Sequence, residues 1–128
     1  MYRLKTSAAF EAAHRIVDYP GKCNRLHGHN WTTEVEITGD TLDELGMLAD
    51  FRLVKQKLTA VLDKLDHRYL NELPTFAAQN PTAENLAKFI FDELSAENFL
   101  REGVKIAAVS VWESPKSCIT YSPEGQQK

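Results

Sequence analysis

Alternating apolar and polar positions near the N-terminus predict two β-strands. Over residues 2–14, one face of an extended chain would carry Tyr2, Leu4, Thr6, Ala8 and Phe10. A second alternating run covers residues 29–39, where one face would carry Trp31, Thr33, Val35 and Ile37. This two-residue period is typical of strands that bury one face against a core. Pro20 and Gly21 favour a loop between the two strands.

Two amphipathic helices are predicted in the middle of the chain. Asp50 can accept hydrogen bonds from the free N–H groups at the start of the first helix. Its apolar residues recur at helical spacing, at Phe51, Val54, Leu58, Val61, Leu62 and Leu65. The second helix is predicted to open at Asn80 and Pro81, because proline suits the first helical position. Its apolar face would consist of Leu86, Phe89, Ile90 and Leu94.

Two further strands are predicted at residues 104–113 and 118–122, joined by a turn at Pro115. A long connection over residues 66–80 separates the two helices, so the predicted element order is ββααββ. Hairpin-like strand pairs at both ends of the chain favour an α+β fold. We therefore expect an antiparallel four-stranded sheet with two helices packed on one face, in a single domain over residues 1–128.

Composition and charge exclude several classes of function. The net charge is −3, and the 15 basic and 18 acidic residues are mixed along the chain. This distribution argues against a nucleic-acid-binding surface. No apolar run approaches the roughly 18 residues that a membrane span needs, and the first residues are too polar for a signal peptide. We expect a cytoplasmic protein with free thiols at Cys23 and Cys118, the latter structural.

The segment CNRLHGHNW, residues 23–31, contains one of the two cysteines and two of the four histidines. His27 and His29 would project to the same face of an extended chain. If the first two strands pair antiparallel, His14 lies beside them at the end of the first strand. Three neutral imidazoles with an open fourth position are typical of catalytic zinc. The spacing leaves a rival open, in which Cys23 is the fourth ligand of a closed structural zinc site.

Asp66 and His67 form an adjacent pair just past the first predicted helix. A carboxylate that holds an imidazole raises its basicity and fixes its tautomer, as a proton relay requires. An isolated pair of this kind is more often a solvated helix end. A structural zinc module has no use for the pair, however, whereas an enzyme with a cysteine base does. The pair therefore favours the catalytic interpretation.

Five segments together resemble the 6-pyruvoyl-tetrahydropterin synthase family: FEAAHRI, CNRLHGH, LDHRYLN, NPTAENLAKFIFD and WESPKSCITY. They cover essentially the whole chain, in order. The short spacing between Cys23 and His27 is most similar to the bacterial 6-carboxy-5,6,7,8-tetrahydropterin synthases of queuosine biosynthesis. The resemblance implies the tunnelling fold, whose subunits form two stacked rings. It implies a homo-oligomer, with six subunits as the expectation and active sites between subunits.

The resemblance also implies a role for each candidate residue at the metal centre. The implied ligands of Zn²⁺ are His14, His27 and His29. Cys23 would be the catalytic base, with His67 and Asp66 as its relay. Because the sites lie between subunits, the relay pair would serve a neighbour's zinc.

Two further positions match substrate-binding residues of the family. Glu113 matches the acidic anchor of the pterin ring, a task that suits a carboxylate because it can accept two hydrogen bonds from a guanidine-like N–H edge. Thr82 matches a threonine that faces the substrate. Ala83 stands where the family often has a second hydroxyl, and we expect no substrate contact there.

The implied activity is a zinc-dependent lyase reaction on 7,8-dihydroneopterin triphosphate. It would release triphosphate and acetaldehyde and leave 6-carboxy-5,6,7,8-tetrahydropterin. Zn²⁺ would act as a Lewis acid toward the side-chain hydroxyls of the substrate, and the Cys23 thiolate would take the acidified proton. Two alternatives stay open. One is a 6-pyruvoyl-tetrahydropterin synthase that stops after triphosphate elimination, and the other is a non-catalytic structural zinc-binding domain.

Overall fold

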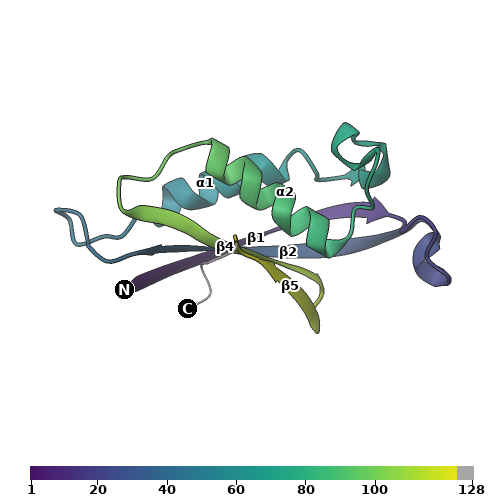
Figure 1. The fold of residues 1–128 in the computed structure, drawn as a ribbon, viewed down its shortest axis with the longest axis horizontal. Coiled ribbons are helices and arrows are strands. Elements are labelled where there is room, and N and C mark those ends of the chain that lie inside the picture. The colour runs from purple at the N-terminus through teal and green to yellow at the C-terminus, as the bar shows by residue number, and fades with distance from the viewer. Residues whose placement is uncertain (124–128) are drawn as a thin grey trace.

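The computed structural model describes residues 1–123 and consists of one sheet with two helices on one of its faces (Figure 1). The strands lie in the order β3-β1-β2-β4-β5. Their bounds are β1 Tyr2–His14, β2 His27–Gly39, β3 Arg68–Tyr69, β4 Val104–Ser114 and β5 Ser117–Tyr121. The helices are α1 Phe51–Leu62 and α2 Ala83–Ala96, and three short 3-10 turns are η1 Lys22–Asn24, η2 Leu70–Glu72 and η3 Pro74–Phe76. The α+β class and the two helices on one face are as predicted.

The predicted four-stranded antiparallel sheet and the order ββααββ need a correction. β1, β2, β4 and β5 are antiparallel neighbours, but β3 adds a fifth strand that pairs parallel with β1. The observed order is therefore ββαβαββ, and the sheet is mixed. β3 contains only two residues, too few to show a period of two. Its pairing depends on how the connection after α1 returns to the sheet, which no local pattern encodes.

β1 and β2 form the central hairpin, and their pairing runs without a register shift from Tyr2↔Gly39 to His14↔His27. Alternate side chains of both strands are buried on the face that carries the helices: Leu4, Phe10, Ala12 and His14, with Trp31, Thr33, Val35 and Ile37. Both predicted strands are confirmed. β2 begins at His27, two residues earlier than predicted, because the histidine pair itself continues the ladder.

A β-bulge in β4 decides which face its last residues occupy. Ile37 pairs with Ile106, whereas Glu36 pairs with Ala108, so one extra residue enters β4 between them. A one-residue insertion moves every later side chain to the opposite face. Val109 and Val111 are buried beyond this point as Ile106 is before it. Glu113 consequently shares the face that carries His14 and His29.

α1 and α2 cover the buried face of the sheet. Asp50 accepts from the Arg52 N–H at 2.9 Å and caps α1 as predicted. The buried residues of α1 are Val54, Leu58, Val61 and Leu62, and Leu65 is buried just beyond it. Phe51, predicted on the same face, is 63% exposed. The helical period predicts which side of a helix faces the core. It does not predict whether the sheet reaches far enough to cover the first turn of the helix, where Phe51 lies.

α2 begins at Ala83, two residues later than its proline signal predicts. Thr82 is the N-cap, and its Oγ1 accepts from the Asn85 N–H at 3.1 Å, so Pro81 precedes the cap and is not the first helical residue. The buried residues of α2 are Leu86, Ala87, Ile90, Phe91 and Leu94. Phe89 is partly buried and packs against this core. Neither helix is long and apolar enough to cross a membrane, a statement that covers residues 1–123.

Candidate metal centre and active site

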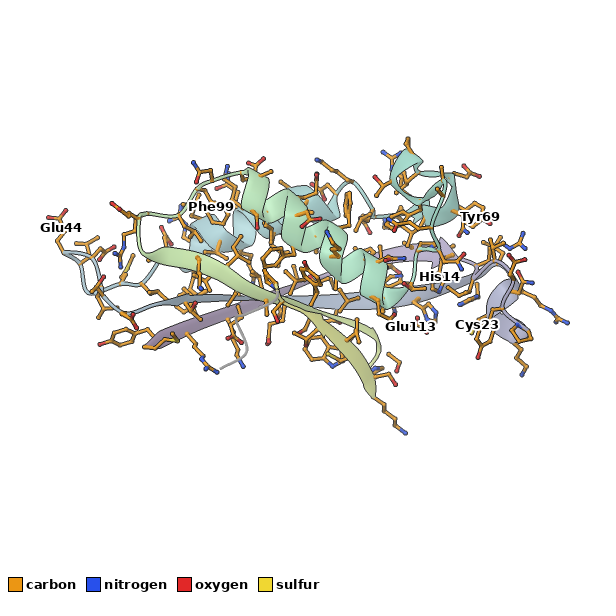
Figure 2. The ribbon with its side chains drawn as sticks, viewed as in Figure 1. His14, Cys23, Glu44, Tyr69, Phe99 and Glu113 are labelled. Carbon is orange, nitrogen blue, oxygen red and sulfur yellow. The ribbon has the colours of Figure 1, made fainter. Side chains whose placement is uncertain are left out.

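The candidate residues gather at one end of the molecule. Figure 2 shows His14, Cys23, Tyr69 and Glu113 at the end where β1 leads into the loop with η1, and Glu44 at the opposite end. This end combines the terminus of β1, the start of β2, the end of β4 and the connection between α1 and α2. Segments distant in sequence therefore meet around the last residue of β1.

His14, His27 and His29 form a cluster that can hold one metal ion. His14 pairs directly with His27, and His29 lies two residues further along the same face of β2. One ring nitrogen from each residue lies within 4.8 Å of the others. The ring centroids are 4.5, 4.8 and 5.2 Å apart, in edge-to-face arrangements. The predicted convergence of the three histidines is confirmed.

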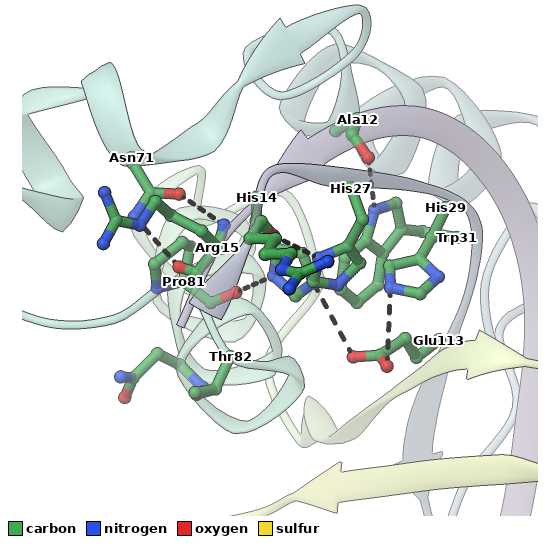
Figure 3. Close-up of polar contacts among 12 residues, drawn as sticks. Ala12, His14, Arg15, His27, His29, Trp31, Asn71, Pro81, Thr82 and Glu113 are labelled. Carbon is green, nitrogen blue, oxygen red and sulfur yellow. Dashed lines mark hydrogen bonds and ion pairs between the residues drawn. The ribbon is translucent and has the colours of Figure 1, made fainter. Parts of the chain in front are cut away.

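Backbone carbonyl groups fix the tautomers of two of these histidines. Nδ1 of His14 lies 2.8 Å from the Pro81 oxygen, and Nδ1 of His27 lies 2.7 Å from the Arg25 oxygen. A carbonyl oxygen can only accept, so each Nδ1 carries the proton and each Nε2 keeps its lone pair. Metal-binding histidines are commonly oriented by such a hydrogen bond from the other ring nitrogen. Figure 3 shows the contact between His14 and Pro81.

The Nε2 atoms of His14 and His29 are buried and make no hydrogen bond within residues 1–123. A buried polar atom without a partner is costly, and such atoms are rare in native proteins. These two atoms converge with a third imidazole, and each neutral ring can present a lone pair from Nε2 when its proton lies on Nδ1. A divalent cation that binds nitrogen, such as Zn²⁺, satisfies them.

Trp31 packs against two of the three histidine rings. Its ring centroid lies 5.0 Å from that of His14 and 5.1 Å from that of His29, edge to face in both cases. Its Nε1 donates to the Ala12 oxygen at 3.2 Å, and the side chain is fully buried. Burial lowers the pKa of both His14 and His29 below the ordinary value. The hydrogen bond to Pro81 at His14 and the nearby Glu113 carboxylate at both rings offset this effect on the pKa only in part. Both imidazoles are thus held in the neutral form that binds metal.

Glu113 faces the histidine cluster from β4. Its Oε1 lies 3.5 Å from Nε2 of His29, and its Oε2 lies 4.0 Å from Nε2 of His14 (Figure 3). Its side chain is 38% exposed, so one side of the carboxylate stays accessible. The family resemblance selects Glu113 from the sequence, whereas its position alone is that of an ordinary strand-end glutamate. The bulge in β4 turns it toward the site, and the shift of the apolar pattern from Val104 and Ile106 to Val109 and Val111 is the signal that sequence analysis missed.

Cys23 lies in η1, in the loop between β1 and β2, and is partly buried with a free thiol. Within residues 1–123, the cluster that can hold a metal contains the three histidines and does not include Cys23. The closed structural site with a fourth, cysteine ligand is therefore not formed in this conformation. The loop nevertheless returns Cys23 to the end of β1, where its carbonyl oxygen accepts from the Ile16 N–H at 2.7 Å.

Asp66 and His67 interact as a pair, as the sequence predicts. Oδ2 of Asp66 lies 3.0 Å from Nδ1 of His67, and this hydrogen bond raises the pKa of His67 above its ordinary value. The pKa of Asp66 is lowered. The main cause is the hydrogen bond that its Oδ1 accepts from the Glu11 N–H, and the hydrogen bond with His67 is the second. The backbone of His67 has a φ of 56°, and its N–H donates to the Glu11 oxygen. The pair is thereby anchored on the edge of β1.

The pair lies away from the metal cluster of its own chain. The side chain of His67 is 73% exposed, and its Nε2 is 3.7 Å from the carboxylate of Glu11. Glu11 precedes the buried Ala12 in β1. Its side chain therefore points to the face of the sheet opposite to that of Ala12. A shallow groove runs beside the pair along β1, β2 and β3. Its lining includes Glu11, Ala13, Gly28, His29, Asn30 and His67. The structure thus brings the three histidines and Glu113 together but leaves His67 on the outer side.

The comparisons with known proteins agree with this geometry. A family model described as 6-pyruvoyl tetrahydropterin synthase matches residues 3–124. The chain belongs to the 6-pyruvoyl tetrahydropterin synthase family. This confirms the resemblance inferred from the sequence.

Alignments with individual relatives cover most of this chain. It is 33% identical over 129 residues to the 6-carboxy-5,6,7,8-tetrahydropterin synthase of Bacillus subtilis. This alignment covers 96% of this chain and 86% of that protein. It is 37% identical over 99 residues to the enzyme of that name from Synechocystis sp., with 73% and 75% covered. The solved 6-pyruvoyl tetrahydropterin synthase of Caenorhabditis elegans superimposes with a TM-score of 0.84 at 29% identity, covering 96% of each chain.

The first prediction concerns the metal. We expect the purified protein to bind about one Zn²⁺ per chain through three imidazole nitrogens. The double variant His27→Ala, His29→Ala should lose it, because a single imidazole does not hold the ion. Glu113→Ala is the matched control: it lies equally close to the cluster and should keep its zinc. Metal analysis after dialysis tests this, and full occupancy in the double variant would refute the site.

Proposed function

We propose that the protein is a zinc-dependent lyase that converts 7,8-dihydroneopterin triphosphate to 6-carboxy-5,6,7,8-tetrahydropterin. Triphosphate and acetaldehyde leave, and water is taken up. The observation that carries the proposal is the pair of buried Nε2 atoms without partners, on His14 and His29, beside an accessible carboxylate. Family membership and relatives named for this product support it. The proposed role is a step in queuosine biosynthesis.

His14, His27 and His29 would hold the zinc, with tautomers set by the Pro81 and Arg25 carbonyl groups. The bound ion supplies Lewis-acid stabilisation to oxygen atoms of the substrate side chain. The chain's own contribution is a rigid cradle. β1 and β2 hold the three rings in register, and the buried Trp31 packs edge to face against the rings of His14 and His29.

Glu113 is the proposed anchor of the pterin ring. Its carboxylate is accessible on one side and lies within 4.0 Å of the cluster, so a ring bound to it would place its side chain at the metal. A carboxylate can accept two hydrogen bonds from the adjacent N–H groups of the ring. Thr82, whose hydroxyl oxygen already caps α2, retains its O–H as a donor toward substrate. Both contacts remain proposals.

Cys23 is the proposed base, because it is a free, partly buried thiol outside the metal cluster but on the loop beside it. A thiol titrates near ~8.5, and a nearby cation favours the thiolate. His67 can supply that charge, since Asp66 raises its pKa. The relay would act first: the thiol of Cys23 would give its own proton to a neutral His67 of a neighbouring subunit, held by Asp66, and the resulting thiolate would take the proton from the substrate.

The proposed assembly is a homo-oligomer, with six subunits as the expectation, in which the relay pair serves a neighbouring subunit. Two observations support it. His67 lies on the outer side of the sheet, away from its own cluster. Exposed apolar side chains occur on the Cys23 loop at Val17, Tyr19 and Leu26, and around the start of α1 at Leu42, Leu45, Met47, Phe51 and Leu53. A neighbouring chain that covered these surfaces would bury them.

The second prediction identifies the product. The zinc-loaded protein incubated with 7,8-dihydroneopterin triphosphate should release acetaldehyde and the 6-carboxy pterin in equal amounts. The alternative favoured by the structural match to a 6-pyruvoyl enzyme is triphosphate elimination alone, which yields 6-pyruvoyl-tetrahydropterin and no acetaldehyde. Chromatography of the pterins with an aldehyde assay separates the two. Unconverted substrate would instead favour a structural zinc domain.

The third prediction separates the roles of Cys23 and Glu113. Cys23→Ala should keep its zinc and its Michaelis constant but lose ~10²–10⁴-fold in turnover, the usual contribution of a general base. Glu113→Ala should keep its zinc and raise the Michaelis constant roughly ten- to hundredfold, as expected for the loss of a charge-assisted hydrogen bond of ~1.5–3 kcal/mol. Steady-state kinetics with metal analysis on the same preparations provides the measurement.

Three outcomes would contradict these assignments. Loss of zinc in Cys23→Ala would make Cys23 a ligand and restore the structural interpretation. Full activity of that variant would remove Cys23 from the chemistry. An unchanged Michaelis constant in Glu113→Ala would place Glu113 outside the binding site.

The fourth prediction tests whether subunits share a site. Cys23→Ala and His67→Ala proteins should each be nearly inactive, but dissociation and joint reassembly should recover part of the activity. Mixed oligomers would contain sites with an intact Cys23 from one chain and an intact His67 from another. Mixing Cys23→Ala with the double variant Cys23→Ala, His67→Ala is the control and should recover nothing. Sedimentation showing a stable monomer, or no recovery on mixing, would refute shared sites.

A further inference from the structure

The chain just beyond β1 is held by the side chain of an asparagine from the connection between the helices. Asn71 Oδ1 accepts from the Arg15 N–H at 2.9 Å, and Asn71 Nδ2 donates to the Arg15 oxygen at 3.0 Å. Figure 3 shows both contacts. A side-chain amide offers the same donor and acceptor as a peptide group. Asn71 therefore replaces a neighbouring strand at this position.

A second asparagine repeats the arrangement two residues further on. Asn80 Oδ1 accepts from the Val17 N–H at 2.9 Å, and Asn80 Nδ2 donates to the Val17 oxygen at 3.2 Å. In an extended chain, the polar backbone groups of residues i and i+2 point to the same side. Arg15 and Ile16 thus follow the line of β1 beyond its assigned end, and a turn begins at Val17. Two side-chain amides take the place of a strand partner along this segment.

The opposite side of the same segment holds the loop that carries Cys23. The Ile16 N–H donates to the Cys23 oxygen at 2.7 Å. Arg15 Nη2 donates to Oδ1 of Asn24, the residue next to Cys23, at 2.8 Å. Residues 15–17 therefore lie between the two asparagines on one side and the Cys23 loop on the other.

His14 has two further contacts besides the chain on either side of it, although one of them comes from Pro81, the residue after Asn80. Its backbone pairs with His27, and its Nδ1 contacts the Pro81 oxygen. A displacement of residues 15–17 would therefore move Cys23, which contacts Ile16 directly, more than His14, whose backbone remains paired with His27. Such a displacement matters because a base must lie within hydrogen-bond reach of its proton, and misplacement by 1 Å can lower a rate ~10²-fold.

We propose that Asn71 and Asn80 are positioning residues that set the location of Cys23 relative to the metal cluster by holding residues 15–17. The proposal rests on the proposed role of Cys23 as the base. It differs from a purely structural role, in which the two amides only satisfy backbone groups and their loss lowers stability without a specific effect on the proton transfer.

The fifth prediction begins with amide hydrogen exchange, which does not depend on activity. Asn71→Ala and Asn80→Ala should each speed the exchange of the Ile16 amide about tenfold, since its bond to Cys23 opens more often. Amides of the β1–β2 ladder should exchange as before. Gln79→Ala is the matched control, because its exposed amide lies next to Asn80 but donates to the Thr75 oxygen at 3.3 Å. It should leave Ile16 unchanged.

The kinetic arm measures turnover with zinc content on the same variants. Asn71→Ala and Asn80→Ala should keep their zinc and Michaelis constant and lose roughly 10–100-fold in kcat. Introduced into Cys23→Ala, the same changes should cost little more, because residues that act as one unit are not additive. Asn71→Asp and Asn80→Asp keep the acceptor and lose the donor. If an alanine variant fails to fold, they should show the same changes with smaller amplitude.

The outcomes distinguish this proposal from the proposed function. An unchanged Ile16 exchange rate in the asparagine variants would overturn the positioning role, whatever their activity. So would an equal further loss of kcat in the Cys23→Ala background, because the asparagines would then act through something other than Cys23. Full activity of Cys23→Ala alone would instead refute the base assignment. The exchange measurement would still decide whether the two asparagines hold the loop.

Discussion

The uninterrupted antiparallel register of β1 and β2 is the constraint on which the site depends. It places His14 opposite His27 and turns His29 to the same face. A slip of one residue would send one strand's side chains to the other face of the sheet, and the cluster would be lost. The register is secured by the burial of Phe10, Trp31 and the aliphatic residues that follow. The hydrophobic core and the metal centre are therefore specified by the same alternation.

The site also depends on a local departure from regular structure. Without the extra residue at the pairing of Ile37 with Ile106, the alternation along β4 would place Glu113 on the face of the sheet that carries no helices. With it, a carboxylate lies beside two imidazoles whose pKa values burial keeps low. Neutral nitrogen donors and a nearby anion suit both a divalent cation and the N–H edge of a pterin.

The free edge of β1 links the remaining parts of the site. Unpaired backbone groups at a sheet edge need partners. Here β3 supplies some, and polar side chains supply others: Asp66 at Glu11, Asn71 at Arg15 and Asn80 at Val17. The connection between the helices therefore satisfies the edge. The same bonds hold Asp66 in place and fix residues 15–17, which contact the Cys23 loop.

The sequence by itself determined the elements and the meeting of the histidines. Period-two patterns, the Asp50 cap and an antiparallel hairpin of consecutive strands are local features, and a hairpin brings His14 to His27 whatever the rest of the chain does. The five family segments likewise indicated the chemistry before any geometry was known. Only the tertiary structure decided the rest. β3 is too short to show a period, and the carbonyl groups that orient His14 and His27 occur at every residue. The direction of His67 depends on a left-handed backbone and on the edge that it meets. These features arise from contacts between distant segments, which alternation along a single strand or helix cannot encode.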